Sequence, residues 1–230
     1  MAKAETTFDA SPSSVAGAVA TWSSVSIGAA AADRIVVLNA QSSRNAGATN
    51  VLSATIDTGG GAVSMTAVAA QTSQGVECVR QFYAHVPSGT TATFVVTYSV
   101  ALVDHQVYAS GMRVTGSMLT PLSSGGDGST DMDSTDPLSV APTIPPGGVF
   151  IGIAGSATNT NSHSWTNATA VVDVGFGSSA NGRHSVGVTT TPGTPTITVQ
   201  GTVNGEDGAL TYVVFRDAQK AFNAPPMVWG

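Results

Sequence analysis

The chain has 230 residues, a formal net charge of −6 and a charged fraction of 10%, well below the roughly 25% of an ordinary globular protein. This acidic balance excludes the positive field on which nucleic-acid binding depends, and no run of about 18 apolar residues occurs that could span a membrane. Hydrophobic residues make up 42% of the chain, and most of the remainder is Gly, Ser, Thr and Asn. Such a composition favours a folded β protein whose surface carries hydroxyl groups in place of ions.

The first half of the chain begins with a segment of weak periodicity. Residues 1–20 are rich in Ala and Ser, and we expect them to form an N-terminal arm. The first expected strand covers 21–28, TWSSVSIG. The second covers 34–40, RIVVLNA, and its continuous apolar centre suits burial on both faces. A third strand at 51–56 ends before three consecutive glycines, which mark a turn.

The clearest strand signal lies at 86–100, VPSGTTATFVVTYSV, where a Pro-Ser-Gly turn is followed by strict alternation. The apolar side consists of Ala92, Phe94, Val96, Tyr98 and Val100. This pattern predicts a central strand with one buried face. Strands are also expected at 63–69 and 76–85, and the second of these should form a hairpin with the central strand. Another strand is expected at 106–115, with Gly111 as the site of a bulge.

The stretch 116–148 is rich in Pro, Gly and Ser and predicts a long irregular loop. It divides the chain into halves of similar strand content, so two domains remain an alternative to one. The strands expected after this loop are 149–154, 169–176, 183–188, 196–203 and 209–215. Asn181-Gly182 predicts a hairpin turn between its flanking strands. No segment of about ten residues shows the apolar stripe of a helix.

About a dozen strands at this spacing predict an all-β protein, an antiparallel jelly-roll-like β-sandwich with extended N- and C-terminal arms. The expected boundaries are 1–20 for the N-terminal arm, 21–215 for a single sandwich domain and 216–230 for the C-terminal arm. The last arm carries Pro-Pro and large apolar side chains, which should pack either on the chain's own domain or on a neighbouring subunit. The predicted partner-binding residues are Phe222, Pro225, Pro226, Met227, Val228 and Trp229.

Two segments have some likeness to ligand-binding motifs. Asp127, Asp131, Asp133 and Asp136 lie in a flexible segment of the kind that binds calcium. Their spacing does not match the twelve-residue calcium loop, so a solvated acidic loop is the alternative. The segment 174–180, VGFGSSA, matches a dinucleotide fingerprint, but the Asn-Gly turn that follows it leaves no room for the required helix.

Other reactive side chains lack the partners that chemistry would need. The four histidines have no second His or Cys at metal-ligand spacing: His85, His105, His163 and His184. Cys78 is expected to be a small core residue. Neither a serine-nucleophile elbow nor a glycosidase carboxylate pair can be identified. We therefore predict no catalytic residue, no metal and no cofactor. Trp165, which lies among asparagines, is either a core residue or part of a sugar-binding surface.

Three segments resemble β-sandwich proteins encoded by tailed bacteriophages. These are TWSSVSIGAAAADRIVVL at 21–38, PSGTTATFVVTYS at 87–99, and PGGVFIGIAG after Pro145, which is followed by Trp165 and the strand at 209–215. The shared motifs are structural, and no site residue carries over. The resemblance implies a role at the virion surface, as a head decoration protein or as a tail or fibre component.

The sequence therefore predicts a non-enzymatic structural protein of a phage virion that decorates or stabilises the capsid exterior. Its expected partners are the major capsid protein or tail proteins and further copies of itself, with no nucleic acid and no membrane. The first alternative is a tail or fibre adhesin that binds host glycans through Trp165 and the 116–148 loop. The second is a glycan-active enzyme on the same fold. No signal peptide is expected, since no apolar segment follows Lys3 and Glu5, and assembly in the host cytoplasm would fit.

Overall fold

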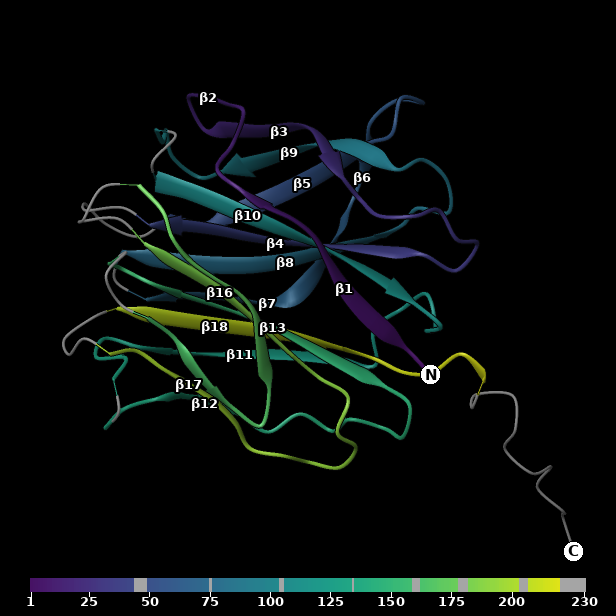
Figure 1. Ribbon diagram of the computed structural model, residues 1–230. Helices are drawn as coiled ribbons and strands as arrows, with labels where there is room; N and C mark the ends of the chain where they lie inside the picture. Colours follow the sequence, from purple (N-terminus) through teal and green to yellow (C-terminus); the bar gives the residue numbers. More distant parts are fainter. Residues whose placement is uncertain are drawn as a thin grey trace, which may run out of the picture.

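The computed structural model describes residues 1–43, 49–74, 76–103, 106–133, 135–158, 162–177, 182–202 and 207–219 (Figure 1). Within these ranges the regular structure consists of antiparallel strands in four sheets, which confirms the all-β, sandwich-like prediction. The sheets lie one on another as four layers, seen from top to bottom in Figure 1. The described residues contain no helix long and apolar enough to cross a membrane.

The first two layers come from the first half of the chain. The first outer sheet has the order β2 (Ser14–Ala16), β3 (Val19–Ser26), β9 (Thr91–Tyr98), β5 (Val51–Asp57) and β6 (Val63–Ser64). The first inner sheet has the order β1 (Lys3–Ala10), β10 (Val107–Thr115), β4 (Ile35–Ser43), β8 (Glu77–His85) and β7 (Thr66–Gln74). These two sheets form the first sandwich.

The other two layers come from the second half. The second inner sheet has the order β11 (Ser123–Ser129), β18 (Gly208–Phe215), β13 (Val149–Ser156), β16 (Arg183–Thr189) and β15 (Thr169–Gly175). The second outer sheet has the order β12 (Leu138–Val140), β17 (Ile197–Gln200) and β14 (Ser164–Thr166). These two sheets form the second sandwich, and its inner sheet faces the first inner sheet.

Both sandwiches follow the same nested pairing of strands. In the first, β1 pairs with β10, β3 with β9, β4 with β8 and β5 with β6. In the second, β11 pairs with β18, β12 with β17 and β13 with β16. An antiparallel ribbon rolled up in this nested way is a jelly roll. The chain therefore contains the jelly-roll pattern twice in succession.

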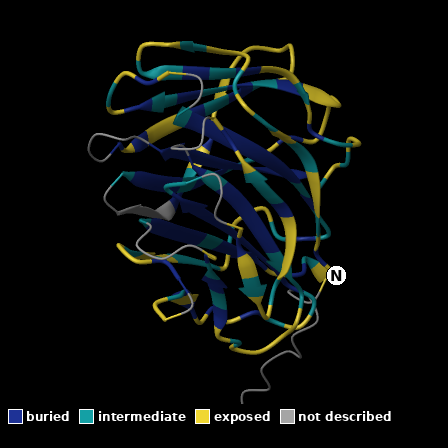
Figure 2. Cartoon of the chain, turned by 60° about the vertical axis from the view of Figure 1, so that its left-hand side comes forward, coloured by how far each residue is buried: buried dark blue, intermediate teal, exposed yellow. Residues whose placement is uncertain are grey.

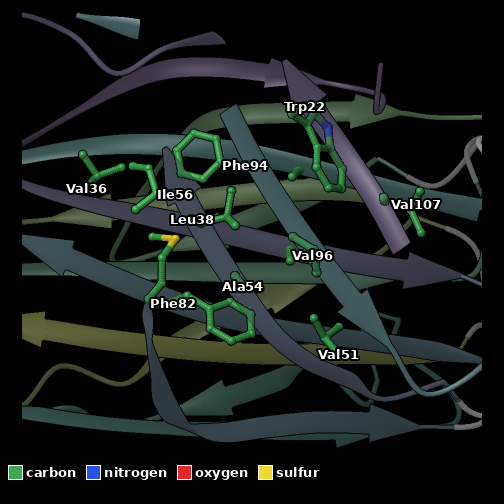
Figure 3. Packing of buried hydrophobic residues seen from close by; sticks show 14 of the residues in the cluster. Trp22, Val36, Leu38, Val51, Ala54, Ile56, Phe82, Phe94, Val96 and Val107 are labelled. Atoms are coloured by element: carbon green, nitrogen blue, oxygen red, sulfur yellow. The ribbon is translucent and has the colours of Figure 1, made fainter. Parts of the chain in front are cut away.

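The core of the first sandwich lies between its two sheets. Trp22, Phe94, Leu38 and Phe82 are fully buried there (Figure 3). In β9 every second residue is buried, as the alternating sequence predicts. Each large side chain of this kind contributes about 1.5–3 kcal/mol when it is removed from water.

The strands of the inner sheets are buried on both faces. Every residue of β4 and of β13 is buried, so the prediction for the apolar run at 34–40 is confirmed. Val36 and Leu38 face the first outer sheet, whereas Ile35 and Val37 belong to a second core between the two inner sheets. We call the space between the inner sheets the junction. Figure 2 shows the buried strands at mid-height and exposed residues mainly at the loops and outer layers.

Arg34 holds together the loops at one end of the first sandwich. Its side chain is fully buried and donates hydrogen bonds only to backbone carbonyls. Nε lies 2.6 Å from the Val86 oxygen, and the two terminal nitrogens reach the oxygens of Gly28 at 2.8 Å and Ser88 at 2.5 Å. A rigid, planar donor set of this kind can serve several carbonyls at once. Arg34 thus joins the β3–β4 and β8–β9 connections.

Two predicted features of the first half are wrong. The expected arm at 1–20 contains β1, β2 and the start of β3, because β1 completes the roll by pairing over its whole length with residues 109–115 of β10. The expected hairpin of 76–85 with 86–100 does not form, because β8 pairs with β4 and β7 while β9 pairs with β3 and β5. The turn at Pro87 therefore crosses between sheets.

A bulge occurs beside Gly111, but in β1 and not in β10. The register of β1 against β10 shifts between Thr6 and Phe8. A Cβ at Gly111 would lie 2.2 Å from the Phe8 ring. Gly111 therefore makes room for an aromatic ring on the neighbouring strand.

The second half also departs from the prediction. The stretch 116–148 contains β11 and β12 instead of one irregular loop. The Gly- and Ser-rich β11 is held by its pairing with β18, and Gly125 accommodates the ring of Tyr212, which would lie 2.8 Å from a Cβ there. The expected pairing of the strands around Asn181-Gly182 is confirmed for β15 and β16. Residues 3–215 form two stacked sandwiches, where a single sandwich was expected over 21–215.

Candidate functional site

Buried polar side chains fill one half of the junction, where they form a continuous line of hydrogen bonds. Gln81 Nε2 donates to Asn39 Oδ1 at 2.9 Å. Asn39 Nδ2 in turn donates to Ser110 Oγ at 3.1 Å, and Ser110 Oγ lies 2.9 Å from His184 Nε2. The first three residues come from β8, β4 and β10 of the first sandwich, whereas His184 belongs to β16 of the second.

From His184 the line returns across the junction to Gln41 of β4 and then reaches the backbone of β16. His184 Nδ1 lies 2.8 Å from Gln41 Oε1, and Gln41 Nε2 donates to the backbone oxygen of Arg183 at 2.9 Å. Because a Gln oxygen only accepts, the His184 proton is assigned to Nδ1 and Nε2 accepts from the Ser110 hydroxyl. All the bonds of the line then run in one direction, and consecutive bonds of this kind polarise one another. Gln81 Nε2 also donates to the backbone oxygen of Ile151 at 3.3 Å.

The environment of His184 keeps its ring neutral. The ring is fully buried and lies 5.1 Å from the Tyr108 ring, centroid to centroid. Burial, with a smaller effect from His163, lowers the pKa of His184 to about 3. A neutral ring is also what the hydrogen bonds require, since Nε2 must accept.

Glu77 lies at the edge of the same polar region. Its carboxyl group is fully buried, neither oxygen has a hydrogen-bond partner in normal geometry, and a Cβ at Gly155 would lie 2.6 Å from Oε1. Burial raises the pKa of Glu77 well above its usual range, and the negative charge of Asp207 acts in the same direction. The protonated form of Glu77 is therefore favoured, because a buried ionised carboxylate is costly.

This polar region was not predicted as a unit, although one signal for it is present in the sequence. Asn39 and Gln41 alternate with Leu38 and Ala40 in an otherwise apolar strand. Such an alternation places two amides on one buried face, where each needs a partner. The partners lie 42 to 143 residues away along the chain, so the sequence pattern alone does not identify them.

Trp165 faces the interior of the second sandwich. The indole nitrogen donates to Ser185 Oγ at 2.7 Å, and the ring covers Gly187 and Gly152, where added Cβ atoms would lie 2.5 Å and 3.1 Å from it. His163 is buried nearby, with Nε2 2.9 Å from Ser156 Oγ, and burial lowers its pKa to about 4. Of the two interpretations of Trp165, a core residue or part of a sugar-binding surface, the structure supports the core residue.

The acidic loop uses its carboxylates to fix its own backbone. Asp127 accepts hydrogen bonds from the backbone of Gly128 and Ser139, and Asp133 accepts from Thr135 and Asp136. The bonds from Thr135 lower the pKa of Asp133. Among the described residues, no group of three or more His, Cys, Asp or Glu is placed so that it could hold a metal ion.

The remaining candidate residues lie apart from one another. His85 Nε2 lies 2.8 Å from the Ala32 oxygen at the surface, and His105 lies outside the described residues. In the stretch 174–180, residues 174 and 175 end β15, and 178–180 are outside the described residues. Cys78 is fully buried, and burial raises the pKa of its thiol to about 12. The predicted partner-binding residues at 222 and 225–229 also lie outside the described residues.

The two outer sheets carry almost no charge. Among their strands, Asp57 at the end of β5 is the one charged residue. A row of outward-facing residues crosses the five strands of the first outer sheet: Ser14, Thr21, Val95, Thr55 and Ser64. On the second outer sheet, Ser139, Thr198 and Thr166 form a similar row. Charged side chains lie instead on the inner sheets and in the loops.

Three of the shallow hollows on the described part of the surface are of similar size. One of about 270 Å³ lies between Asn167 and Thr191, at the end of the second sandwich. A second, of about 260 Å³, lies at Asp57 on the first outer sheet. A third, of about 270 Å³, lies between Pro12 and Val103. Ser or Thr residues line all three, and the third also has Val15, Leu102 and Val103 in its wall.

Comparison with known proteins gives no family for this chain. No protein-family model matches the sequence, and no curated protein matches it significantly. One solved structure aligned with the chain is that of the STIV MCP, a viral major capsid protein, at 10% identity, with 98% of this chain and 99% of that chain covered and a TM-score of 0.28. Another is the CBM22-1–CBM22-2 tandem domain of Xyn10C from Paenibacillus barcinonensis, at 9% identity, with 96% and 93% covered and a TM-score of 0.27. Scores this low carry no argument about fold or function.

Proposed function

We propose that the chain is a structural protein of a phage virion that decorates or stabilises the capsid exterior. The observation that carries this proposal is the stack of two jelly rolls, which presents hydroxyl-rich sheets with almost no charge on both of its outer faces. Jelly rolls serve as building blocks in viral capsids, although the same fold also occurs in lectins. The resemblance of three sequence segments to phage β-sandwich proteins supports the same role.

The stack has the mechanical properties that such a role needs. All four layers are connected by packed cores, and the buried hydrogen bonds of the junction fix how one sandwich lies on the other. Interiors packed to this density transmit force with little compression. A surface with few lysines and many hydroxyl groups is also a poor substrate for trypsin-like proteases.

Attachment to the particle is assigned to the C-terminal segment. Its sequence combines Phe222 and Trp229 with a Pro-Pro pair, and large aromatic side chains are enriched at the centres of protein interfaces. The expected contacts are to the major capsid protein and to further copies of this chain. The location is then the virion, after assembly in the host cytoplasm.

The test compares three forms of the full-length protein on particles that lack it. Wild type and the matched control Asn223→Ser should restore a regular coat on the capsid, visible by low-resolution imaging. A chain without residues 221–230 should keep its thermal unfolding midpoint but leave the particles bare. A truncated chain that coats particles as well as wild type contradicts the anchoring role, and wild-type protein found only on the tail contradicts capsid decoration.

The alternative is a tail or fibre adhesin for host glycans. Trp165, its first candidate residue, is partly buried, with its ring packed on Gly187 and its indole nitrogen bonded to Ser185, so it is a poor stacking platform. What favours an adhesin is the hollow at Asp57, which has polar groups on an otherwise uncharged sheet. A coat over the capsid and a glycan-binding hollow are compatible, because they use different surfaces.

A further inference from the structure

The hollow at Asp57 differs from the other two in having a carboxylate at its wall. It is lined by Ser24 of β3, by Asp57, Thr58 and Gly59 where β5 ends, and by residues 91–93 of β9. We call it the Asp57 hollow. Its volume of about 260 Å³ is below the roughly 300–1,000 Å³ that encloses a drug-sized ligand. A single monosaccharide unit is of suitable size.

The backbone of β3 is distorted beside the hollow. The register of β3 against β9 shifts between Trp22 and Val25, so β3 contains a bulge there. Within the bulge Ser24 has φ = 54°, and it is one of two described residues other than Gly with a positive φ. A non-glycine residue in this conformation costs about 1 kcal/mol or more and is found preferentially where a binding site needs it. The bulge brings Ser24 to the wall of the hollow.

Asp57 is oriented before any ligand arrives. Its Oδ1 accepts hydrogen bonds from the backbone nitrogens of Gly59 at 2.7 Å and Gly61 at 3.0 Å. Among the described residues, no donor reaches Oδ2. A carboxylate that is held by one oxygen in this way can offer the other to a hydroxyl group of a ligand, and hydrogen bonds to a charged acceptor are the stronger kind.

The surroundings of the hollow select against anionic ligands and against protein partners. Thr93 pairs directly with Asp57, and the neighbouring outward positions are Thr, Ser and Val. The aromatic residues in the strands of this sheet are all buried: Trp22, Phe94 and Tyr98. Protein interfaces are typically enriched in aromatic residues and Arg and depleted in Ser. A phosphate or a nucleic acid would need a cation, and the strands of this sheet contain neither Lys nor Arg.

We propose that the Asp57 hollow is a binding site for a neutral sugar, with Asp57 accepting from ligand hydroxyl groups and Thr93, Thr91 and Ser24 exchanging hydrogen bonds with them. A polyhydroxylated, uncharged ring matches both the polarity and the size of the site. The Ser and Thr rows that lead away from the hollow can contact further sugar units of a chain. This proposal deepens the adhesin alternative and is independent of capsid attachment.

The experiment uses full-length protein on an array that carries neutral oligosaccharides of glucose, galactose, mannose and N-acetylglucosamine beside sialylated and sulfated ones. Wild type should bind at least one neutral series and none of the anionic ones. Asp57→Asn should reduce the affinity roughly tenfold, since the amide oxygen can keep the bonds to Gly59 and Gly61 while the charge is lost. Thr93→Val should weaken binding as well. Thr191→Val, in a hollow of the same size on the second sandwich, is the matched control and should bind like wild type.

Three results would overturn the proposal. The first is that wild type binds no neutral oligosaccharide. The second is that Asp57→Asn and Thr93→Val both leave oligosaccharide binding unchanged. The third is that titration with calcium chloride alone shows a cation bound through Asp57. Thermal unfolding of each variant shows whether it is folded, and Thr93→Val tests the site separately from the loop held by Asp57. Attachment to the particle is measured separately, with the 221–230 deletion. A negative result for sugar binding therefore does not contradict capsid decoration, and a negative result for decoration does not contradict sugar binding.

Discussion

Replacing His184 by Phe should destabilise the protein by removing the central member of the buried hydrogen-bond line. The ring volume and the contact with Tyr108 are largely retained, but the Ser110 hydroxyl loses its acceptor and the Gln41 oxygen loses its donor. Each buried polar group left unpaired costs about 1–3 kcal/mol, so the expected loss at pH 7 is about 2–6 kcal/mol. Equilibrium unfolding in urea measures it as a fall in the transition midpoint at an unchanged slope.

The pH dependence of this loss gives a sharper test. Burial lowers the pKa of His184 to about 3, whereas an unfolded His titrates near 6.5. Because the unfolded chain binds the proton first, the wild type loses stability as the pH falls from about 6.5 towards 3. At pH 4 this loss is about 3 kcal/mol for His184. The Phe variant lacks it, so the stability difference between the two proteins should shrink by that amount.

The matched control is Val186→Ala, which lies two residues further along β16 in the apolar half of the junction. It should destabilise by a similar order of magnitude, about 1–3 kcal/mol, but by the same amount at pH 7 and pH 4. A His184→Phe variant that loses less than about 1 kcal/mol at pH 7 would show that the hydrogen-bond line adds no net stability. A difference from wild type that stays constant between the two pH values would show that His184 is not held neutral.

Three further outcomes are expected. Arg34→Met should cost about 3 kcal/mol or more in urea unfolding, because three buried backbone carbonyls lose their donor; a cost below about 1 kcal/mol would contradict the role given to Arg34. Glu77→Gln should be more stable than wild type, and the difference should grow as the pH rises above the range in which an unfolded Glu titrates, because the raised pKa of Glu77 makes its ionisation unfavourable in the folded state; an equal pH slope for both proteins would refute this. Cys78 should react with a thiol reagent only after unfolding, because it is fully buried and its pKa is raised to about 12; rapid labelling of the native protein would contradict its position in the core.

A strand of this fold can be predicted from the sequence when the order of its apolar and polar residues matches its burial. β9 alternates and β4 is continuously apolar, so their one-sided and two-sided burial can be predicted directly. β11 reads SSGGDGS and has neither pattern. It is a strand because β18 offers it a complete ladder of backbone partners, and tertiary context of this kind overrides local propensity. The same holds for the short strand β2.

The candidate sites were less predictable than the strands. Sequence motifs direct attention to Trp165 and to the acidic loop, and both have structural roles in the fold. The polar line of the junction and the Asp57 hollow depend on residues brought together from strands far apart in the chain. The spacing of residues along the sequence does not predict such long-range contacts, because the nested pairing of the strands determines them.

The nested pairing has a consequence for how the protein is made. β1 cannot pair until β10 has been synthesised, and β11 cannot pair until β18 has been synthesised. Each roll therefore closes only after its last strand has left the ribosome. Contacts between such distant residues make for slow folding, and N-terminal units of a growing chain generally fold first. The first sandwich can then close alone, but with Asn39, Gln41 and Gln81 facing water. These amides stay hydrated until the second sandwich covers them, whereas Ile35 and Val37 on the same face are apolar and stay exposed for as long.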